Sequence, residues 1–314
     1  MTRVAVVDLG TNTTRLLVAD VVDGRVSEVR RMNTVTRLGE DVDAGGELIE
    51  QAMERVFAAV DEYRRAIDEL GAERTVAVAT SAVRDARNGE RFQRELRQRF
   101  GIDARIISGE EEARLTFAGA TAERPPGGAP LLVLDIGGGS TEFVVGRAGA
   151  GPDFHVSTQA GSVRQTERHL ASDPPAPGEV EALSNDIREI VEANVPPAVR
   201  SGVRDGIAVA GTPTSLAAID QRLDPYDSAK VHGYRLELDS CERILKMLAA
   251  QPESERREVV GLHPDRAATI VAGAVILVQS MRIFGLPAIE VGEHDILYGA
   301  ALATAGGLSN LEYG

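Results

Sequence analysis

Two segments of the chain place an aspartate ahead of a run of small polar residues with the same spacing. Residues 7–18 read VDLGTNTTRLLV, and residues 134–145 read LDIGGGSTEFVV. In register, each segment has an Asp, then Leu or Ile, then Gly, then a short run of Gly, Asn, Thr or Ser. Apolar residues flank both runs. Each segment therefore predicts a strand, a tight polar turn and a second strand.

Turns of this composition are suited to phosphate. Glycine lets the backbone approach a ligand closely, successive N–H groups form a nest for an anion, and hydroxyl groups add donors. The alternative is an ordinary hairpin in which glycine supplies a positive φ. Three consecutive glycines are costly in a purely structural turn, so the pair of segments favours phosphate binding. The predicted phosphate-binding residues are Thr11, Asn12 and Thr13 in the first turn and Gly137, Gly138, Gly139, Ser140 and Thr141 in the second. The Asp that ends each first strand could hold Mg2+, which prefers hard oxygen ligands.

Strands that alternate with helices must position these turns, which indicates an α/β fold. The first half predicts a hairpin at 4–22, a strand at 26–33, a helix at 49–70, a strand at 75–80, a helix ending at Phe100, a strand at 104–108 and a helix from Glu110. The second half predicts a second hairpin, a helix at 179–194, a strand at 207–212 followed by a helix, and a final strand, turn and helix. The segment RPPGGAP at 124–130 marks a domain boundary. We therefore expect domains at 1–124 and 125–314, with a C-terminal helix near 300–314 that packs back on the first.

Composition limits the classes of function. The chain has 314 residues, 43% of them hydrophobic, and 48 acidic against 34 basic residues give a net charge of −14. This charge argues against nucleic-acid binding, and it requires a local basic or metal-bearing site for any polyanionic ligand. The single Cys241 excludes an internal disulfide and fits a reducing compartment. No signal peptide is visible, and the apolar stretch 267–278 is shorter than the ~20 residues of a membrane span. We expect that stretch to be a buried helix of a cytoplasmic protein without membrane contact.

Six motifs together resemble one protein family. They are DLGTNTTRLLV at the start, TSAVRDARN at 80–88, IISGEEEARLTFAGA at 106–120, DIGGGSTEFVV at 135–145, AGTPTSLAA at 210–218 and GEHDILYG at 292–299. The chain is similar to the exopolyphosphatase and guanosine pentaphosphate phosphatase (Ppx/GppA) family of the actin-like ATPase superfamily. The resemblance implies two actin-like (ribonuclease H-like) α/β domains with an active-site cleft between them, a homodimer, and hydrolysis of a terminal phosphoanhydride with Mg2+, or with Mn2+ in its place. Longer members carry a C-terminal HD-type helical domain, and this chain is expected to lack it.

The resemblance places the catalytic base on Glu112, the last of three adjacent glutamates. The other two have structural explanations. Ser108 and Glu111 fit a capping box, and Glu110 in the first turn suits the helix dipole. Neighbouring carboxylates raise the pKa of Glu112 while the helix N-terminus lowers it, so the net direction stays open.

The other roles implied by the resemblance are distributed over both halves. Metal binding is assigned to Asp135, Glu142 and Asp8, and for Asp8 a cap on its own turn is the alternative. Arg84 is assigned to the reacting phosphate, because the guanidinium fork pairs two oxygens at once. Arg15 is a further phosphate ligand unless it points away from the turn. Gly211 and Thr212 are assigned to the nucleotide or to a distal phosphate.

Lys230, His232 and Arg235 form a basic cluster that either holds the tail of a chain or is an exposed loop. The remaining histidines show no metal-ligand spacing, and they are His155, His169, His263 and His294.

The resulting hypothesis is an exopolyphosphatase that releases orthophosphate from inorganic polyphosphate, with shorter chains preferred. Water would attack in a single displacement, because positioning and charge stabilisation suffice for phosphoryl transfer. Guanosine pentaphosphate is the alternative substrate. A sensor that binds polyphosphate or nucleotide without catalysis is a second alternative. A kinase would need an Asp placed to activate an acceptor hydroxyl, and the motifs contain none.

Overall fold

The computed structural model describes residues 1–306, and its internal contacts divide the chain into two units. Unit 1 comprises Met1–Arg124 together with the segment from Ile296, and unit 2 comprises Pro125–Asp295. The division falls at the start of the Pro- and Gly-rich segment. The last helix of the described chain ends at Thr304, and the rest of the helix expected near 300–314 lies outside the described residues.

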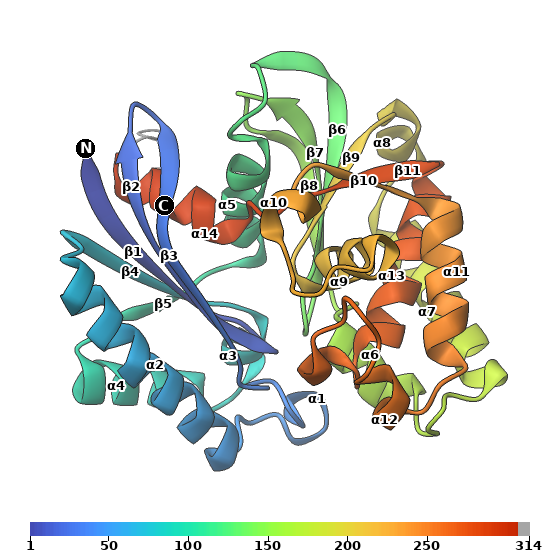
Figure 1. Cartoon of the computed structure of the whole chain (residues 1–314), viewed down its shortest axis with the longest axis horizontal. Helices are drawn as coiled ribbons and strands as arrows, with labels where there is room; N and C mark the ends of the chain where they lie inside the picture. The colour runs from blue at the N-terminus through green and yellow to red at the C-terminus, as the bar shows by residue number, and fades with distance from the viewer. Residues whose placement is uncertain (307–314) are drawn as a thin grey trace. The chain divides into compact units, whose positions relative to one another are not determined.

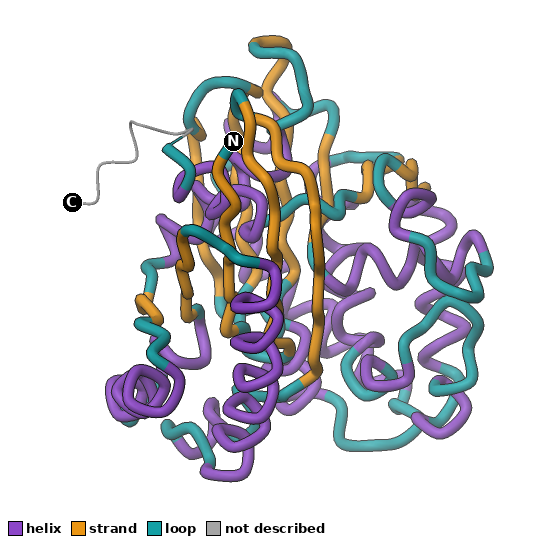
Figure 2. The backbone as a smooth tube through the Cα atoms, turned by 60° about the vertical axis from the view of Figure 1, so that its left-hand side comes forward, coloured by secondary structure: helices purple, strands orange, loops and turns teal. Residues whose placement is uncertain are grey.

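Unit 1 is built on a five-stranded sheet. Its elements are β1 (Thr2–Leu9), β2 (Thr13–Val22), β3 (Arg25–Val35), β4 (Arg74–Ala79), β5 (Ala104–Ile106), α1 (Val42–Gly45), α2 (Glu50–Leu70), α3 (Ser81–Asp85), α4 (Gly89–Phe100), α5 (Gly109–Thr121) and α14 (Ile296–Thr304). The strand order is β3-β2-β1-β4-β5. The first three strands are antiparallel neighbours, and β4 and β5 continue the sheet in parallel with β1. The long strands of this sheet run side by side in Figure 2.

Helices cover both faces of the unit 1 sheet because side chains of a strand alternate between its two faces. On one face, Val7 of β1 packs in a core with Phe57 of α2. On the other face, Val6 packs in a separate core with Leu297 of α14. Figure 1 shows α2 and α4 on one side of the blue strands and α5 and α14 on the other. Helix α14, the last one in the described residues, therefore belongs to the fold of the first unit.

Unit 2 repeats this plan with an additional edge strand. Its elements are β6 (Gly127–Ile136), β7 (Thr141–Ala148), β8 (Pro152–Thr158), β9 (Gly206–Val209), β10 (Tyr234–Glu237), β11 (Ala288–Val291), α6 (Ser162–His169), α7 (Pro177–Asn194), α8 (Pro197–Gly202), α9 (Gly211–Gln221), α10 (Ser228–Val231), α11 (Leu238–Ala249), α12 (Glu253–Arg256), the 3-10 helix η1 (Pro264–Arg266) and α13 (Ile270–Phe284). The strand order is β10-β11-β9-β6-β7-β8. Three antiparallel strands followed by two parallel ones occur in both sheets. The shared order supports a duplicated domain.

The core of unit 2 surrounds helix α13, whose residues are buried from Ile270 to Met281. The prediction of a buried helix in the apolar stretch is confirmed. Phe284 at its end stacks on Phe143 of β7, with ring centroids 6.1 Å apart. Cys241 is buried in the same core and forms no disulfide. Within residues 1–306, every helix is either too short or too polar to cross a bilayer.

One predicted helix is two helices in the structure. The segment after β4 was expected to run unbroken to Phe100, but α3 ends at Asp85 and α4 begins at Gly89. Between them, the side-chain amide of Asn88 accepts a hydrogen bond from the backbone N–H of Leu48 (2.8 Å) and donates to the carbonyl of the same residue (2.9 Å). A partner 40 residues away satisfies this side chain, so local helical periodicity does not reveal the break.

Candidate active site

The first Asp-Gly turn closes between Gly10 and Thr13. The Gly10 N–H donates to the carbonyl of Thr13 at 3.2 Å, and the strands pair so that Asp8 lies directly opposite Arg15. A Cβ at Gly10 would approach the carbonyl of Thr13 to 2.8 Å, so glycine is needed for the close fit of the backbone.

The carbonyl groups of this turn point into the chain that follows β3. The carbonyl of Thr11 accepts from the N–H of Gly39 at 2.8 Å, and that of Asn12 accepts from Thr36 at 3.0 Å and Arg37 at 2.9 Å. In a trans peptide the C=O and the next N–H point in opposite directions. The two N–H groups that follow these carbonyls therefore face away from that chain, as an anion nest requires.

The second Asp-Gly turn has the same construction. The Gly137 N–H donates to the carbonyl of Ser140 at 3.0 Å, and Asp135 lies directly opposite Glu142. The two Asp-Gly turns therefore share the same closing hydrogen bond and the same cross-strand register beside it.

Helix α6 holds the carbonyl groups of the second turn. The carbonyls of Gly137 and Gly138 accept from the N–H groups of Ser162 and Val163, each at 2.9 Å. Gly161, just before the helix, lies against the same peptides, since a Cβ there would be 2.2 Å from the carbonyl oxygen of Gly138. The N–H groups of the turn are thereby directed away from α6.

Arg164 also holds the second turn from α6, and the sequence analysis did not include this residue. Its side chain is buried, and Nε donates to the carbonyl of Gly139 at 2.9 Å. An arginine beside a valine in a short amphipathic segment carries no local mark of such a contact. Only the packing of α6 against the turn reveals it.

The two hairpins carry different charges at their cross-strand positions. In unit 1, Nε and Nη2 of Arg15 both donate to Oδ2 of Asp8, at 2.8 and 2.6 Å. In unit 2, the partner of Asp135 is Glu142, which is 1% exposed and accepts from the Ser157 hydroxyl at 2.8 Å. Arg15 thus shares the face of Asp8 and does not point away from it.

The carboxylates of unit 2 fit a magnesium ion better than Asp8 does. Side chains directly opposite each other on antiparallel strands have Cβ atoms about 4.5–5.5 Å apart, and like charges there repel. A cation bound by Asp135 and Glu142 offsets this repulsion with the hard oxygen ligands that Mg2+ prefers. Asp8 already shares an oxygen with a guanidinium, so its predicted metal role competes with an ion pair.

Two of the three adjacent glutamates have structural partners. The Ser108 hydroxyl caps α5 by accepting from the Glu111 N–H at 3.1 Å. The expected capping box is only half formed, because the Glu111 carboxylate forms an ion pair with Arg105. Glu110 is exposed and pairs with Arg114 at 2.6 Å, one helical turn along.

Glu112 is the buried member of the three. It is 8% exposed and shares one face of α5 with Leu115, Thr116 and Gly119, which lie three, four and seven residues further on. This is the spacing of the inward face of a helix. Neighbouring residues on a helix are about 100° apart, so the three glutamates point in different directions, and Glu112 is the one that is buried.

Arg84 holds the Glu112 carboxylate. Its Nη1 donates to Oε2 of Glu112 at 3.0 Å and to the carbonyl of Ile107 at 3.0 Å. The guanidinium is therefore fixed between a backbone carbonyl and the predicted base. This contact brings together the two residues that the sequence analysis assigned to catalysis.

Burial raises the pKa of Glu112 to about 7. Burial is the largest cause, the Arg84 charge and hydrogen bond oppose it, Asp8 adds to it and Arg15 opposes it. The sequence left the direction of the pKa shift of Glu112 open, and the structure shows that it is upward. Its main cause is desolvation of the carboxylate and not the adjacent glutamates.

The predicted distal turn lies between β9 and α9. Ala210 has a φ of 72°, in the left-handed region that favours glycine. At Gly211, a Cβ would lie 1.5 Å from Nη1 of Arg266, so the guanidinium occupies the space beside the backbone that a side chain would need. The Thr212 hydroxyl instead faces α13, since a Cβ at Gly273 would lie 2.3 Å from its Oγ1. The structure thus places Arg266, a residue that the sequence analysis did not include, beside the backbone of this turn.

Two members of the predicted basic cluster, Lys230 and Arg235, each lie beside a carboxylate. Lys230 is exposed and lies 3.4 Å from Asp227, while Arg235 is exposed and lies 3.4 Å from Glu237. Each cation has a nearby carboxylate that offsets its charge. His232 instead takes part in a different contact.

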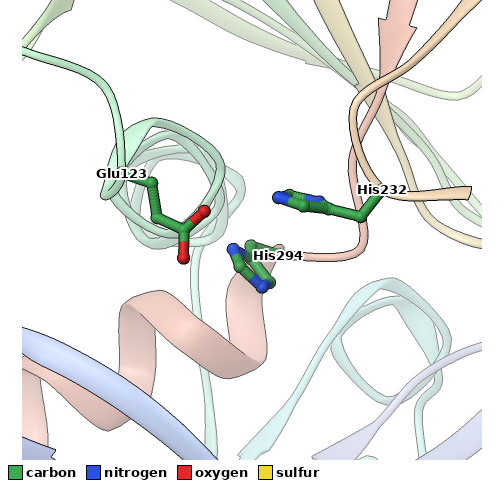
Figure 3. A group of neighbouring side chains, drawn as sticks. All are labelled: Glu123, His232 and His294. Atoms are coloured by element: carbon green, nitrogen blue, oxygen red, sulfur yellow. The ribbon is translucent and has the colours of Figure 1, made fainter. Parts of the chain in front are cut away.

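The ring of His232 lies against that of His294 at a tilt of 34°, a contact that sequence spacing did not indicate. Their ring centroids lie 4.2 Å apart, and Nδ1 of His232 accepts from the backbone N–H of Glu293 at 3.2 Å. Figure 3 shows the two imidazoles side by side. The pairing of β10 with β11 brings together residues that are 62 positions apart in the sequence, because one precedes the first strand and the other follows the second.

Comparisons with known proteins agree with this geometry. The model of the Ppx/GppA phosphatase family matches residues 17–301. The chain is 38% identical over 323 residues to Exopolyphosphatase 2 of Mycobacterium tuberculosis, covering 98% of this chain and 99% of that protein.

Among solved structures, an exopolyphosphatase-like protein matches with a TM-score of 0.91 at 34% identity, covering 96% of this chain and 97% of the other. The Ppx/GppA family member of Aquifex aeolicus matches with a TM-score of 0.81 at 30% identity, covering 97% of each chain. Two sheets of one topology, two matching Asp-Gly hairpins and near-complete coverage by these relatives lead to one conclusion: the chain belongs to the Ppx/GppA phosphatase family.

Proposed function

We propose that the protein hydrolyses the terminal phosphoanhydride bond of inorganic polyphosphate and releases orthophosphate. One observation carries the chemistry: Glu112 is a buried carboxylate with a pKa of about 7, held by Arg84. Relatives named exopolyphosphatase, one of them 38% identical over nearly the whole chain, support the substrate.

Glu112 is the proposed general base. A carboxylate with a pKa near the working pH is deprotonated in about half of the molecules, yet it accepts a proton more readily than an ordinary glutamate. Arg84 fixes its orientation by a hydrogen bond to one oxygen, at 3.0 Å. The other carboxylate oxygen is the proposed partner of water.

The turns are the proposed phosphate ligands. Their carbonyls are held by the chain behind them, so the N–H groups are preorganised for an anion and need no rearrangement during the reaction. Asp135 and Glu142 are the proposed ligands of Mg2+, which would neutralise charge on the phosphoryl oxygens. Arg15, anchored by Asp8, remains a proposed phosphate ligand of unit 1.

The proposed step is a single in-line displacement. The oxygen of water forms a bond to the terminal phosphorus, its proton passes to Glu112, and the bond to the bridging oxygen breaks. The electron pair of that bond leaves with the shortened chain. Phosphoryl transfer of this kind depends on positioning and charge neutralisation, so no covalent nucleophile is required.

The proposal also includes the finer points of the family resemblance. These are a homodimer, a cytoplasmic location and a preference for shorter chains. Size-exclusion chromatography, cell fractionation and a kinetic series over polyphosphate lengths test them in turn. Guanosine pentaphosphate is the alternative substrate within the same chemistry.

The decisive experiment measures phosphate release with Mg2+ from polyphosphate and from guanosine pentaphosphate at equal concentration. Glu112→Gln is expected to lower kcat at least ~100-fold, the usual scale for loss of a general base. Glu110→Gln is the matched control, because the neighbouring glutamate is exposed and paired with Arg114. It is expected to retain wild-type turnover.

Each outcome decides between the functions. Near-normal turnover by Glu112→Gln would refute the assignment of the base. Phosphate release from guanosine pentaphosphate and not from polyphosphate would show that the nucleotide is the substrate. Release from neither substrate would favour a binding protein without catalysis.

A further inference from the structure

We propose that Arg164 is a positioning residue that sets the orientation and donor strength of the Gly139–Ser140 peptide in the second turn. The inference rests on the proposed function of that turn as a phosphate ligand. It adds a residue that no motif of the chain indicated.

Arg164 contacts the turn twice. Its backbone N–H donates to the carbonyl of Gly138 at 3.2 Å, and its side-chain Nε donates to the carbonyl of Gly139 at 2.9 Å. The residue is 9% exposed, so the second hydrogen bond is largely protected from water. A charged donor makes such a bond about twice as strong as a neutral one.

The Gly139 carbonyl matters because of the N–H that follows it. In the trans peptide between Gly139 and Ser140, fixing the C=O toward Arg164 directs the N–H of Ser140 the opposite way. The preceding peptides of the turn are held by backbone N–H groups at the start of α6. Arg164 therefore completes the alignment of three successive N–H groups into one nest.

The charge of Arg164 has a second effect on the same peptide. A cation that hydrogen-bonds a carbonyl oxygen polarises the amide, and hydrogen bonds in series strengthen one another. The Ser140 N–H thereby becomes a stronger donor toward an anion. In unit 1 the corresponding carbonyls accept from the backbone N–H groups of Thr36, Arg37 and Gly39. The guanidinium contact distinguishes the second turn from the first.

The run of glycines in the second turn explains why the side chain of Arg164 is needed. Three glycines in a row have a large conformational entropy in the unfolded chain and no side chains to restrict them in the folded one. Their alignment depends on bonds from outside the turn. Arg164 supplies the bond at the end of the run, next to the serine.

The test compares Arg164 with a second buried arginine of unit 2. Arg256 is 4% exposed, and its Nε donates to the carbonyl of Ala267 at 2.8 Å, on a different segment. Arg164→Ala and Arg256→Ala both remove a buried guanidinium from a backbone carbonyl. Only the first is expected to lower kcat, by about 10- to 100-fold, the scale of misplacing a reactive group by about 1 Å.

Chemical rescue separates positioning from stability. Methylguanidinium added to Arg164→Ala is expected to restore part of kcat, because it can refill the site and bind the Gly139 carbonyl. It is expected to leave Arg256→Ala unchanged. Equal effects of the two substitutions on kcat, or no recovery in a folded Arg164→Ala protein, would overturn the proposal.

Arg164→Lys keeps a charge and serves if Arg164→Ala does not fold. In this variant, amide hydrogen exchange is measured on the segment 137–141, with and without tripolyphosphate. The lysine is expected to speed exchange there and to weaken the protection that tripolyphosphate confers, with no change at 211–215. Unchanged exchange in 137–141 would overturn the role of Arg164.

The exchange measurement does not depend on catalysis. A wild-type protein that releases no phosphate would refute the proposed function, while faster exchange in Arg164→Lys would still support the hold of Arg164 on the turn. The failures of the two proposals are thus distinguishable.

Discussion

The hairpins β1–β2 and β6–β7 close their turns in the same way but place opposite charges across from the shared position of the Asp. In both, the first glycine of the turn donates to the carbonyl three residues later, and the turn carbonyls are held by the chain after the third strand. In unit 1, Asp8 faces Arg15, whereas in unit 2 Asp135 faces Glu142.

This difference teaches how one scaffold can serve two kinds of ligand contact. An Asp opposite an Arg is neutral as a pair, and the carboxylate anchors a guanidinium. An Asp opposite a Glu carries two negative charges, and a divalent cation lowers their repulsion. The residue opposite the Asp therefore differs in charge between the two units, and this difference is the basis of the metal site proposed for unit 2.

The largest expected effect tests this contrast at the two aspartates. Asp135→Asn is expected to lower kcat about 100-fold or more at limiting Mg2+ and to raise the Mg2+ concentration for half-maximal phosphate release, because metal ligation and charge neutralisation are lost together. Asp8→Asn is expected to lower activity by loosening Arg15 while the Mg2+ requirement stays the same. Magnesium titrations of both variants check the difference.

A raised Mg2+ requirement in Asp8→Asn equal to that in Asp135→Asn would break the comparison. It would show that Asp8 ligates the metal despite its ion pair with Arg15. Both substitutions remove one negative charge without a change in size, so a difference between them reports on what each carboxylate binds.

A second prediction concerns the pH dependence of stability. The ordinary pKa of Glu112 is 4.5, and in the folded chain it is about 7. The folded state therefore binds an additional proton between these values, and its stability falls as the pH rises through this window. Glu112→Gln lacks this loss, so it is expected to gain about 2–3 kcal/mol relative to wild type between pH 5 and pH 8. Urea unfolding at both pH values measures it.

If the unfolding free energies of both proteins changed equally between pH 5 and pH 8, the raised pKa of Glu112 would be contradicted. The amide oxygen of Gln can still accept a hydrogen bond from Arg84, and any change in stability that does not depend on pH cancels in this difference. A result of opposite sign would mean that Glu112 is charged and stabilised by its neighbours.

The third prediction compares the glycines behind the two turns. A Cβ at Gly161 would lie 2.2 Å from the carbonyl oxygen of Gly138, which is backbone, whereas a Cβ at Gly39 would lie 2.2 Å from Cγ2 of Thr11, a side-chain atom. Gly161→Ala is expected to cost about 1–3 kcal/mol of unfolding free energy and to displace the turn, since overpacking against backbone cannot be relieved by a rotamer change. Gly39→Ala is expected to cost less. Thermal unfolding and kcat of both variants test the order.

The smallest expected effect lies in the acid limb of the pH profile. The limb of kcat/KM is expected near pH 7, where Glu112 titrates. Arg84 and Arg15 both lower this pKa, and the Arg84 contribution is the larger. Arg84→Met is therefore expected to move the limb to higher pH by about one unit, and Arg15→Met by less. A limb that stays in place in both variants would show that a different group controls it.

Much of the fold was readable because its signals are local. The apolar stretch at 267–278 predicted a buried helix, and the helix and strand periodicities predicted the hairpins and α2 close to their observed bounds. The break between α3 and α4 was missed, because the contact of Asn88 with Leu48 at this point joins residues 40 positions apart.

The candidate site was readable in part for the same reason. The two turns and the glutamates are marked by residue type and spacing. The inward face of α5 was also available, because Leu115, Thr116 and Gly119 follow Glu112 at helical spacing. Arg164 and Arg266 were missed, because nothing near them in the chain marks their contacts with the glycine turns.

The sequence by itself determined the two Asp-Gly hairpins, the alternation of strands and helices, and the family. These follow from side-chain periodicity and from glycine at turns, which act over a few residues. The tertiary structure decided that Arg15 pairs with Asp8, that burial raises the pKa of Glu112, and that Arg164 holds the second turn. Such contacts depend on which segments fold against each other, and their energies come from desolvation and from hydrogen bonds between residues far apart in the chain.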